Sequence, residues 1–419
     1  MDRRSFLAGL GATLAARAIA LPKLKIAAVE VTRLDGHRET VAGVDRQYQA
    51  NPLHVYDELR PAPYHDSPNP AKRTTTVSAL YLKIRTDQGL DALYGPIDKE
   101  TAIVVLDQLR PFLIGKDALA GETLWDQMYR SNRHSRRGTF LMGISAVDNT
   151  LWDLRGRYYK IPVYRLLGGP TRASVEAYAS CLGYSLEPEA VRKRALAFKE
   201  DGFRYQKWFL AYGPGDGPEG LRKNVELVRI LRETVGDDVQ LMFDVYSGWD
   251  QTYALEWAKQ VERYHPHWLE EAVHPEKIES FVNLRRSVGF PIASGEHFYG
   301  RWEVEEYLKA GALNVVQADP EWCGGVSELV KICTVASLHD VQVIPHGHSI
   351  HAALHVVASQ SPMTCPLVEY LVIKMSSYYH FEREAPHPVR GRIALPERPG
   401  FGIEWDPAKI EKQSAMAPV

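Results

Sequence analysis

The chain has 419 residues, and its 50 Lys and Arg side chains against 52 Asp and Glu side chains give a formal net charge of −2. Hydrophobic residues make up 45% and charged residues 24% of the chain, proportions that argue against a disordered, collagenous or coiled-coil protein. The balanced charge offers no basic surface for nucleic acid, and four cysteines without a CxxC pair argue against a disulfide scaffold or a structural zinc site.

Residues 1–21 have the features of an export signal. The run Arg3-Arg4-Ser5-Phe6-Leu7 resembles the twin-arginine export motif, and the apolar stretch after it ends in small residues at Ala18-Ile19-Ala20. The stretch is too short to span a bilayer and is interrupted by Arg17, so we expect no stable membrane insertion after export. We predict a periplasmic or otherwise exported protein, with a cytoplasmic location as the alternative.

Residues 22–169 predict an α+β domain. Runs rich in β-branched residues at Leu24–Leu34 and Thr76–Thr86 favour strands, whereas residues 36–72 between them show no sustained period. A long irregular segment inside a compact domain is usually functional or disordered. The helical patterns that follow cover residues 99–116 and 143–160.

Residues 170–379 alternate short apolar runs with amphipathic helices. The eight runs are Val175–Ala179, Tyr205–Leu210, Val239–Phe243, Trp268–Leu269, Pro291–Ala293, Leu313–Gln317, Val341–Ile344 and Leu367–Val368. Eight strands separated by helices predict parallel strands with right-handed crossovers, which close into a (β/α)8-type barrel. A doubly wound open sheet is the alternative, but no Gly-rich phosphate loop follows its first strand. We expect the Pro-rich residues 380–419 to return to the first domain.

Acidic residues stand at the ends of three consecutive strands of this barrel. Asp244, Glu270 and Glu296 recur every 26 residues, so one βα repeat separates each carboxylate from the next. A single carboxylate at a strand end is usually solvated or caps the next helix, but catalytic groups of such barrels also lie at this rim. Three converging carboxylates suit Mg²⁺, which prefers oxygen ligands and keeps positions open for water and substrate.

The other strand ends add a base and further charged groups. Asp319 ends the sixth strand and His346 the seventh, so the carboxylate can accept the second ring N–H of the imidazole and raise its basicity. Lys207 stands on the second strand and Glu369 on the eighth. The rim would therefore combine a cation, a three-carboxylate metal site, a His–Asp pair and an acid.

With these residues the chain resembles the enolase superfamily, mandelate racemase subgroup, over nearly all of its length after the leader. Within the subgroup it is most similar to the L-rhamnonate dehydratases. The shared motifs are Ala146-Val147-Asp148-Asn149-Thr150-Leu151-Trp152-Asp153-Leu154, Ser294-Gly295-Glu296-His297, Gln317-Ala318-Asp319, Trp322-Cys323-Gly324-Gly325, Pro345-His346-Gly347 and Gly391-Arg392-Ile393. The resemblance implies that the first domain is a capping domain, completed by the C-terminal segment.

The resemblance also implies roles for the rim residues. Carboxylates at positions matching Asp244, Glu270 and Glu296 bind Mg²⁺ in that family. A pair matching His346 and Asp319 is the general base, and residues matching Lys207 and Glu369 contact the substrate carboxylate or its enolate. Glu369 would act as a donor there if it is protonated. Self-association into a homo-oligomer is expected from the resemblance alone.

One departure from the subgroup bears on the reaction. Members often carry Lys-x-Lys on the second strand, but here the run is Lys207-Trp208-Phe209, and Phe209 cannot take a proton. Because two-base racemisation needs a base on each substrate face, the pattern favours a one-base dehydration. His346 would remove the C2 proton of an aldonic acid, and loss of the C3 hydroxyl would give a 2-keto-3-deoxy acid. The alternatives are a racemase, epimerase or cycloisomerase that uses the same enolate, and a non-catalytic sugar-acid-binding protein.

Four further residues are candidates for contacts with a small-molecule sugar acid. His297 follows Glu296, and Tyr246 lies just beyond the third strand. His54 and Arg60 belong to the irregular early segment, which would form a lid over the barrel mouth. The resemblance places substrate choice in such loops of the capping domain.

Overall fold

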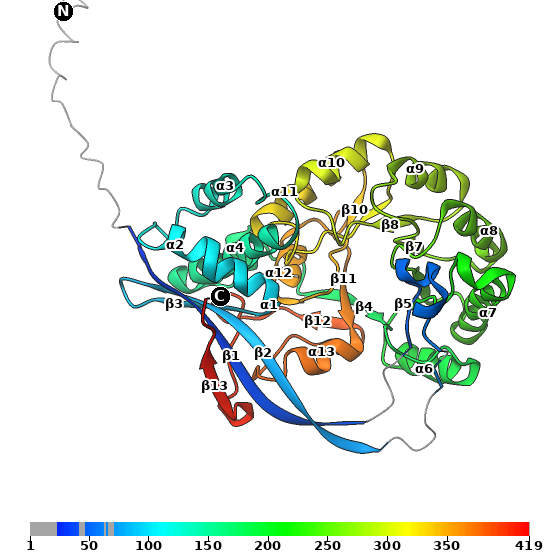
Figure 1. Ribbon diagram of the computed structural model, residues 1–419, viewed down its shortest axis with the longest axis horizontal. Coiled ribbons are helices and arrows are strands. Elements are labelled where there is room, and N and C mark those ends of the chain that lie inside the picture. Colours follow the sequence, from blue (N-terminus) through cyan, green and yellow to red (C-terminus); the bar gives the residue numbers. More distant parts are fainter. Residues whose placement is uncertain (1–22, 42–46, 63, 66–70, 419) are drawn as a thin grey trace, which may run out of the picture.

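A computed structural model describes residues 23–41, 47–62, 64–65 and 71–418 of the chain (Figure 1). The export signal predicted at residues 1–21 lies outside the described residues and stays a prediction. Among the helices of the described part, none combines the length and the apolar character needed to cross a membrane.

An antiparallel sheet forms the base of the capping domain. Its strands are β1 (Ile26–Val41), β2 (Lys72–Thr86), β3 (Asp91–Ile97) and the C-terminal β13 (Lys412–Ala415), in the order β13-β1-β2-β3. The pair β1 and β2 runs in register from Ile26 opposite Thr86 to Val41 opposite Lys72.

This ribbon is longer than the sequence predicts. Residues 36–41 and 72–75 are strand, not irregular, although most of their side chains are polar and outside the core. Apolar alternation marks only the part of a strand that packs on a core. Two strands that project beyond the core are held by hydrogen bonds to each other, and those leave no hydrophobic pattern.

Helices cover one face of this sheet. They are α1 (Lys99–Val104), η3 (Val105–Leu109), α2 (Arg110–Leu113), α3 (Gly121–Ser131), α4 (Gly138–Tyr159) and α5 (Val163–Leu166), preceded by the short turns η1 (Pro52–Val55) and η2 (Asp57–Leu59). The helix α4 lies between the cap sheet and the barrel (Figure 1). Its Asp148 and Asn149 accept hydrogen bonds from the backbone of Ser327 and Val326 at the start of a barrel helix. These side chains therefore cap that helix from the other domain.

The second sheet is a rolled parallel sheet. Its strands are β4 (Ser174–Ser180), β5 (Tyr205–Phe209), β6 (Gln240–Asp244), β7 (Trp268–Glu270), β8 (Ile292–Ser294), β9 (Val315–Val316), β10 (Gln342–Val343) and β11 (Leu367–Leu371). Each pairs in parallel with the next along the chain from β4 to β10, and the last strand, β11, pairs with the first, β4. The remaining seam, between β10 and β11, is bridged by a hydrogen bond from Val343 N–H to Thr364 O at 2.8 Å. This arrangement confirms the predicted (β/α)8-type barrel with its cap and excludes the open doubly wound sheet.

Helices connect and surround the barrel strands. They are α6 (Pro188–Glu200), η4 (Pro214–Asp216), α7 (Gly217–Val235), α8 (Gln251–Val261), η5 (Glu262–Tyr264), α9 (Ile278–Ser287), α10 (Arg301–Ala310), α11 (Gly325–Ser337), α12 (His351–Ser359) and α13 (Val372–Tyr378). The C-terminal segment touches both domains: β12 (Arg392–Ala394) pairs with β4, and after η6 (Pro407–Lys409) the strand β13 pairs with β1.

The interior of the barrel is packed with side chains. One buried residue from each of seven strands or their ends contributes to this layer: Tyr178, Met242, Trp268, Ala293, Val315, Ile344 and Leu367. A filled interior leaves no room for ligands, so the space for chemistry lies above it, at the carboxyl ends of the strands.

Candidate active site

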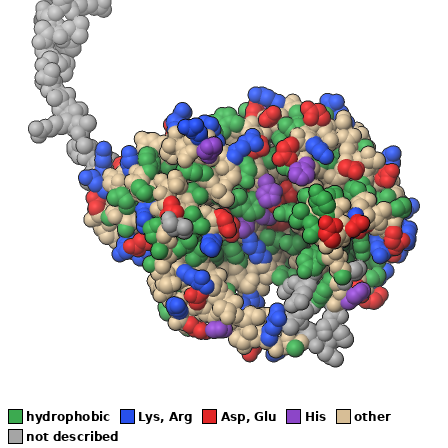
Figure 2. Space-filling model, viewed as in Figure 1, with side chains coloured by type: hydrophobic (Ala, Val, Ile, Leu, Met, Phe, Trp, Pro, Cys, Tyr) green, Lys and Arg blue, Asp and Glu red, His purple; other side chains and the backbone are tan. Residues whose placement is uncertain are grey.

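The structure brings the predicted rim residues together. They stand on or just after consecutive strands: Lys207 on β5, Asp244 on β6, Glu270 on β7, Glu296 after β8, Asp319 after β9, His346 after β10 and Glu369 on β11. Parallel strands all end at one edge, which is why residues spread over more than 160 positions meet. Figure 2 shows histidine and acidic side chains near the centre of the corresponding face of the molecule.

Asp244, Glu270 and Glu296 form a compact group of carboxylates. One oxygen from each lies within 4.8 Å of the others, and all three side chains are buried. Burial raises the pKa of Asp244 and raises that of Glu270 to about 8, because a charged carboxylate is poorly solvated there. Three buried carboxylates suit a divalent cation such as Mg²⁺, which prefers oxygen ligands. Its charge would offset both the repulsion among the carboxylates and the loss of their solvation.

Lys207 lies among these carboxylates. Its Nζ is 3.1 Å from Asp244 Oδ2 and 2.8 Å from Glu369 Oε1, and it also pairs with Glu270 Oε1. Burial lowers its pKa, but the charges of Glu270 and Glu369 outweigh this effect and hold the pKa well above its usual value. Lys207 is therefore a fixed positive charge. A cation bound by Asp244 and Glu270 would compete with it for the same oxygens.

His346 and Asp319 form the expected pair. The imidazole Nδ1 lies 2.7 Å from Asp319 Oδ2, and Nε2 lies 3.8 Å from Glu296 Oε2. When Nδ1–H is donated to Asp319, the lone pair of the neutral imidazole is on Nε2, on the side of Glu296. Burial lowers the pKa of His346, but the charge of Glu296 and the hydrogen bond to Asp319 outweigh it and raise the pKa to about 9.

Glu369 is an acceptor in this structure. Its Oε2 accepts a hydrogen bond from the Gly347 N–H at 2.8 Å, and its Oε1 pairs with Lys207. Burial raises its pKa, but Lys207 and His346 outweigh that effect and lower it to about 2. A donor role was expected only for a protonated Glu369, and the lowered pKa favours the ionised form. A Cβ at position 347 would lie 2.8 Å from Glu369 Cγ, so only glycine fits between the base and this acid.

His297 and Tyr246 also lie at the rim. His297 Nε2 is 3.3 Å from Glu296 Oε1, and the rings of Tyr246 and His297 are 6.3 Å apart between centroids. Tyr246 has a positive φ of 46°, a conformation that costs energy for a side chain other than Gly or Asn. The chain turns directly after Asp244, and this turn directs Tyr246 toward the site.

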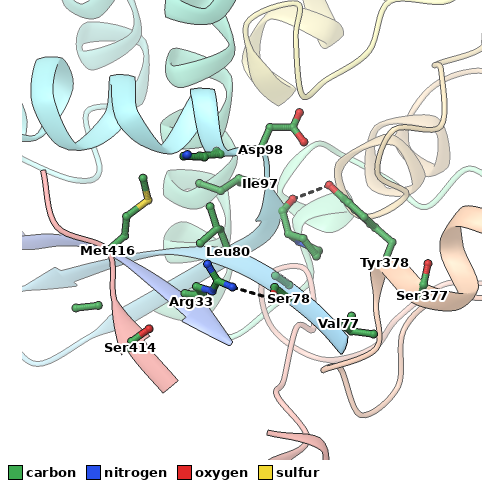
Figure 3. A pocket seen from close by; sticks show the side chains of 14 residues that line it. Arg33, Val77, Ser78, Leu80, Ile97, Asp98, Ser377, Tyr378, Ser414 and Met416 are labelled. Carbon is green, nitrogen blue, oxygen red and sulfur yellow. Dashed lines mark hydrogen bonds between the residues drawn. The ribbon is translucent and has the colours of Figure 1, made fainter. Parts of the chain in front are cut away.

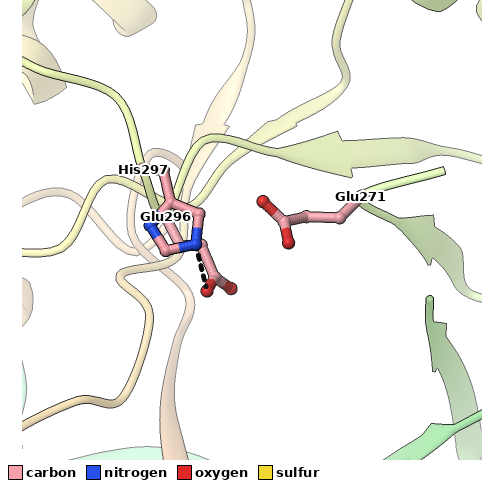
Figure 4. A group of neighbouring side chains, drawn as sticks. All are labelled: Glu271, Glu296 and His297. Atoms are coloured by element: carbon pink, nitrogen blue, oxygen red, sulfur yellow. Dashed lines mark ion pairs between the residues drawn. The ribbon is translucent and has the colours of Figure 1, made fainter. Parts of the chain in front are cut away.

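Glu271 and Trp322 were not predicted as site residues, although Trp322 belongs to one of the motifs that carry the resemblance. Figure 4 shows Glu271 directed toward Glu296 and His297, with which it forms a second group of oxygen and nitrogen donors within 4.8 Å. The Trp322 ring stacks on His297 at 5.0 Å and lies 5.0 Å from His346. A glutamate beside a ligand and a tryptophan after Asp319 carry no periodic signal. Their part in the site appears only once the strands are closed.

His54 and Arg60 lie on the lid segment, defined here as residues 47–62, beside the β5 and β6 ends. Arg60 Nε donates to His54 O at 2.7 Å, and a side chain at Gly215 would collide with the Arg60 guanidinium. The segment is tied to the barrel by hydrogen bonds from Gln47 N–H to Gly183 O and Ala50 N–H to Leu210 O. Among the described contacts, neither His54 nor Arg60 forms a hydrogen bond or ion pair with the rim residues.

Comparison with known proteins agrees with this geometry. Residues 55–168 match the mandelate racemase / muconate lactonizing enzyme N-terminal domain, and residues 190–409 match the enolase C-terminal domain-like family. An L-rhamnonate dehydratase of Saccharopolyspora erythraea is 36% identical over 315 residues, which cover 73% of this chain and 77% of that protein.

Two solved structures are also similar. The rhamnonate dehydratase of Gibberella zeae complexed with Mg has a TM-score of 0.77 at 26% identity, over 92% of this chain and 95% of that one. The 3,6-anhydro-D-galactonate cycloisomerase of Zobellia galactanivorans has a TM-score of 0.73 at 27% identity, over 93% and 100% of the two chains. The chain therefore belongs to the mandelate racemase / muconate lactonizing enzyme family of the enolase superfamily and is similar to its rhamnonate dehydratases.

Proposed function

We propose that the protein is a Mg²⁺-dependent acid-sugar dehydratase that converts an aldonic acid into a 2-keto-3-deoxy sugar acid. Its class is that of the hydro-lyases, supported by the dehydratase relatives. The observation that carries the proposal is the position of His346 Nε2, which lies 3.8 Å from Glu296 Oε2 of the three-carboxylate group, while Nδ1 lies 2.7 Å from Asp319 Oδ2.

In this proposal Asp244, Glu270 and Glu296 hold the ion. A bound Mg²⁺ supplies positive charge that stabilises the second negative charge developing on the substrate carboxylate when its α-proton leaves. Lys207, which contacts Asp244 and Glu270, adds a second positive charge beside the same group. The remaining steps are carried by side chains of this chain.

Neutral His346 takes the C2 proton at Nε2, while Asp319 stabilises the imidazolium that results. The imidazolium then donates that proton to the C3 hydroxyl, which leaves as water if it lies on the same face. The C2–C3 double bond that remains is an enol, and its tautomerisation gives the 2-keto acid. Because His346 passes the C2 proton on to the leaving hydroxyl, a single base is enough.

Phe209 supports dehydration over racemisation. It is buried, and its ring lies 5.2 Å from Lys207 Nζ, at the position where a second lysine would stand in a two-base enzyme. Hydrocarbon at this position accepts no proton, so the opposite substrate face has no base from β5. The substrate is proposed to be a sugar acid because two relatives, each 36% identical to this chain, carry names of L-rhamnonate dehydratases.

The test is a screen of aldonic acids with Mg²⁺, scored for release of 2-keto acid and for exchange of the C2 hydrogen in deuterated buffer. Water loss from at least one aldonic acid supports the proposal. The cycloisomerase neighbour makes isomerisation the second candidate, and a product of unchanged mass would favour it. Tight binding without exchange would show a sugar-acid-binding protein instead. The proposed homo-oligomer is tested separately by the mass of the protein in solution.

A further inference from the structure

The seam between the capping domain and the barrel runs beside the catalytic base. A cavity of about 590 Å³ opens between the cap strands and α13, and Figure 3 shows Asp98 of the cap and Tyr378 of the barrel on its walls. The Tyr378 hydroxyl donates to Pro96 O at 2.9 Å. This hydrogen bond joins the end of β3 to α13, and two cap side chains, Tyr94 in β3 and Asp98 just after it, lie on the side of Asp319.

The first connection goes through His348. Its Nε2 lies 3.2 Å from Asp98 Oδ2, and Lys374 Nζ lies 2.9 Å from its Nδ1 and 2.7 Å from its carbonyl oxygen. Because an ammonium group only donates, Nδ1 accepts from Lys374 and the ring proton is on Nε2, toward Asp98. The His348 ring is thus held in one tautomer between a cap carboxylate and a barrel lysine.

The second connection goes through Glu321. The Tyr94 hydroxyl of β3 donates to Glu321 Oε1, and both side chains are buried. Tyr94 lies in β3, and Asp98 follows the last residue of that strand, Ile97, and precedes α1. Two residues of the barrel loops, Glu321 and His348, are therefore each held by a side chain of the cap.

Both connections end on the same carboxylate. Asp319 Oδ1 accepts the Glu321 N–H at 2.6 Å, and Asp319 Oδ2 accepts the His348 N–H at 3.2 Å. Oδ2 also holds His346 Nδ1 at 2.7 Å. Each oxygen of the group that orients the base thus receives a backbone donor whose own residue is anchored to the cap.

We propose that the cap positions the catalytic base through two bridges, Tyr94–Glu321 and Asp98–His348, which fix the carboxylate of Asp319. The four are positioning residues, since they act through Asp319 and His346. The inference rests on the proposed function, in which His346 is the base. The cap would then do more than cover the substrate: its docking completes the geometry of the proton transfer. Residues that orient a functional group typically cost about 10- to 100-fold in activity when they are removed.

The test uses Tyr94→Phe and Asp98→Ala in the full-length, Mg²⁺-loaded protein. Tyr94→Phe removes only a hydroxyl, and Asp98 makes no capping hydrogen bond to α1, so both variants should fold. We expect each to lower kcat about ten-fold with KM nearly unchanged, and the double variant to lower it further. Asp98→Asn, which keeps an oxygen beside His348 Nε2, should restore most of kcat.

A matched control is Lys331→Gln. Lys331 pairs with Glu122 of α3 at 2.7 Å, so it also joins the barrel to the cap, but away from Asp319. This variant should keep the wild-type kcat. Equal kcat values for the control, Tyr94→Phe and Asp98→Ala would overturn the inference, as would an Asp98→Asn variant as impaired as Asp98→Ala.

A second measurement does not need turnover. In protein labelled with ¹⁵N-histidine, the Nδ1 resonance of His346, identified by its loss in His346→Asn, reports the hydrogen bond to Asp319. We expect it to shift in Tyr94→Phe and Asp98→Ala and to stay in place in Lys331→Gln. An unchanged resonance in all variants would contradict the inference. If the wild-type protein dehydrates no aldonic acid, the proposed function fails, and this resonance still decides the positioning role.

Discussion

The barrel rim and the lid segment, which lies beside the ends of β5 and β6, are built differently. The rim side chains are buried and fixed by strand ends, as for Asp244 and Glu270, the last residues of β6 and β7. The lid segment consists of two short turns, with Val55 64% and Tyr56 55% exposed. Buried strand ends allow little choice of position, whereas exposed turns are held by a few hydrogen bonds.

This difference in structure suggests that the rim and the lid segment have different roles. Chemistry common to a family needs charges at fixed distances, and the rim provides them. Selection among sugar acids needs a surface that tolerates change, and loops provide it at little cost to the fold. Changes at the rim should therefore affect kcat strongly, whereas changes in the lid segment should affect KM modestly.

Removal of the metal should have the largest effect on the rim. Without a divalent cation, Asp244, Glu270 and Glu296 repel one another and nothing offsets the charge that develops on the substrate. We expect chelation to abolish dehydration and added Mg²⁺ to restore it, with a rise in melting temperature as Mg²⁺ binds the folded state. Activity and thermal unfolding are measured before and after dialysis against EDTA. Full activity after verified metal removal would be incompatible with the proposed site.

Replacement of His346, the proposed base, should have the second-largest effect. His346→Asn keeps a polar group of similar size but removes the proton acceptor, so exchange of the C2 hydrogen should fall by about 10²–10⁴-fold. Exchange is followed by NMR in deuterated buffer, with metal binding measured in parallel. His339→Asn, on the surface and paired with Glu305, is the matched control and should behave as the wild type. Undiminished exchange in His346→Asn would remove the histidine from the mechanism.

The pH dependence follows from the raised pKa of His346, about 9 in the metal-free protein against 6.5 for a free histidine. A base must be neutral, so exchange should rise with pH and level off above the pKa. The group that raises it most is Glu296, and a cation bound there should bring the apparent pKa of the loaded enzyme below 9. A rate that falls as pH rises from 6 to 8 would contradict this assignment.

The same shift predicts a change in stability. Because the folded-state pKa is above the unfolded value, protonated His346 stabilises the metal-free protein fully below pH 6.5, and this contribution is lost as pH rises toward 9. The difference in free energy of unfolding between wild type and His346→Asn, measured by urea denaturation, should shrink over this range. A difference that does not depend on pH would show that the shift is absent.

The smallest effect is expected in the lid segment. Arg60→Ala removes the hydrogen bond to His54 O, worth about 1 kcal/mol, so KM for the sugar acid should rise about five-fold while kcat stays the same. Arg229→Ala, which removes exposed ion pairs on α7, serves as the control. A large loss of kcat in Arg60→Ala would show that the lid segment takes part in the reaction step, as the rim does.

Much of the barrel was predictable because its signal is periodic. Each βα repeat adds one strand end at the same rim, so the 26-residue spacing of Asp244, Glu270 and Glu296 was enough to expect a group of carboxylates. The same regularity placed His346 one strand from Asp319. The extension of β1 beyond Leu34 was missed, because a polar ribbon pairs through its backbone and leaves no apolar pattern.

Other features depended on contacts between distant segments. Tyr94 in β3 and Asp98 just after it carry no distinguishing signal in the sequence, and they matter because their side chains contact the loops after β9 and β10. Glu369 was expected to act as a donor only if protonated, and Lys207, nearby only in the folded barrel, lowers the pKa of Glu369 and so favours its ionised form. The sequence alone determined the order of the strands and the side chains at their ends, since both follow from local periodicity. Tertiary structure decided which groups share charge and which cap residues reach the base, because electric fields and hydrogen bonds depend on distance in space.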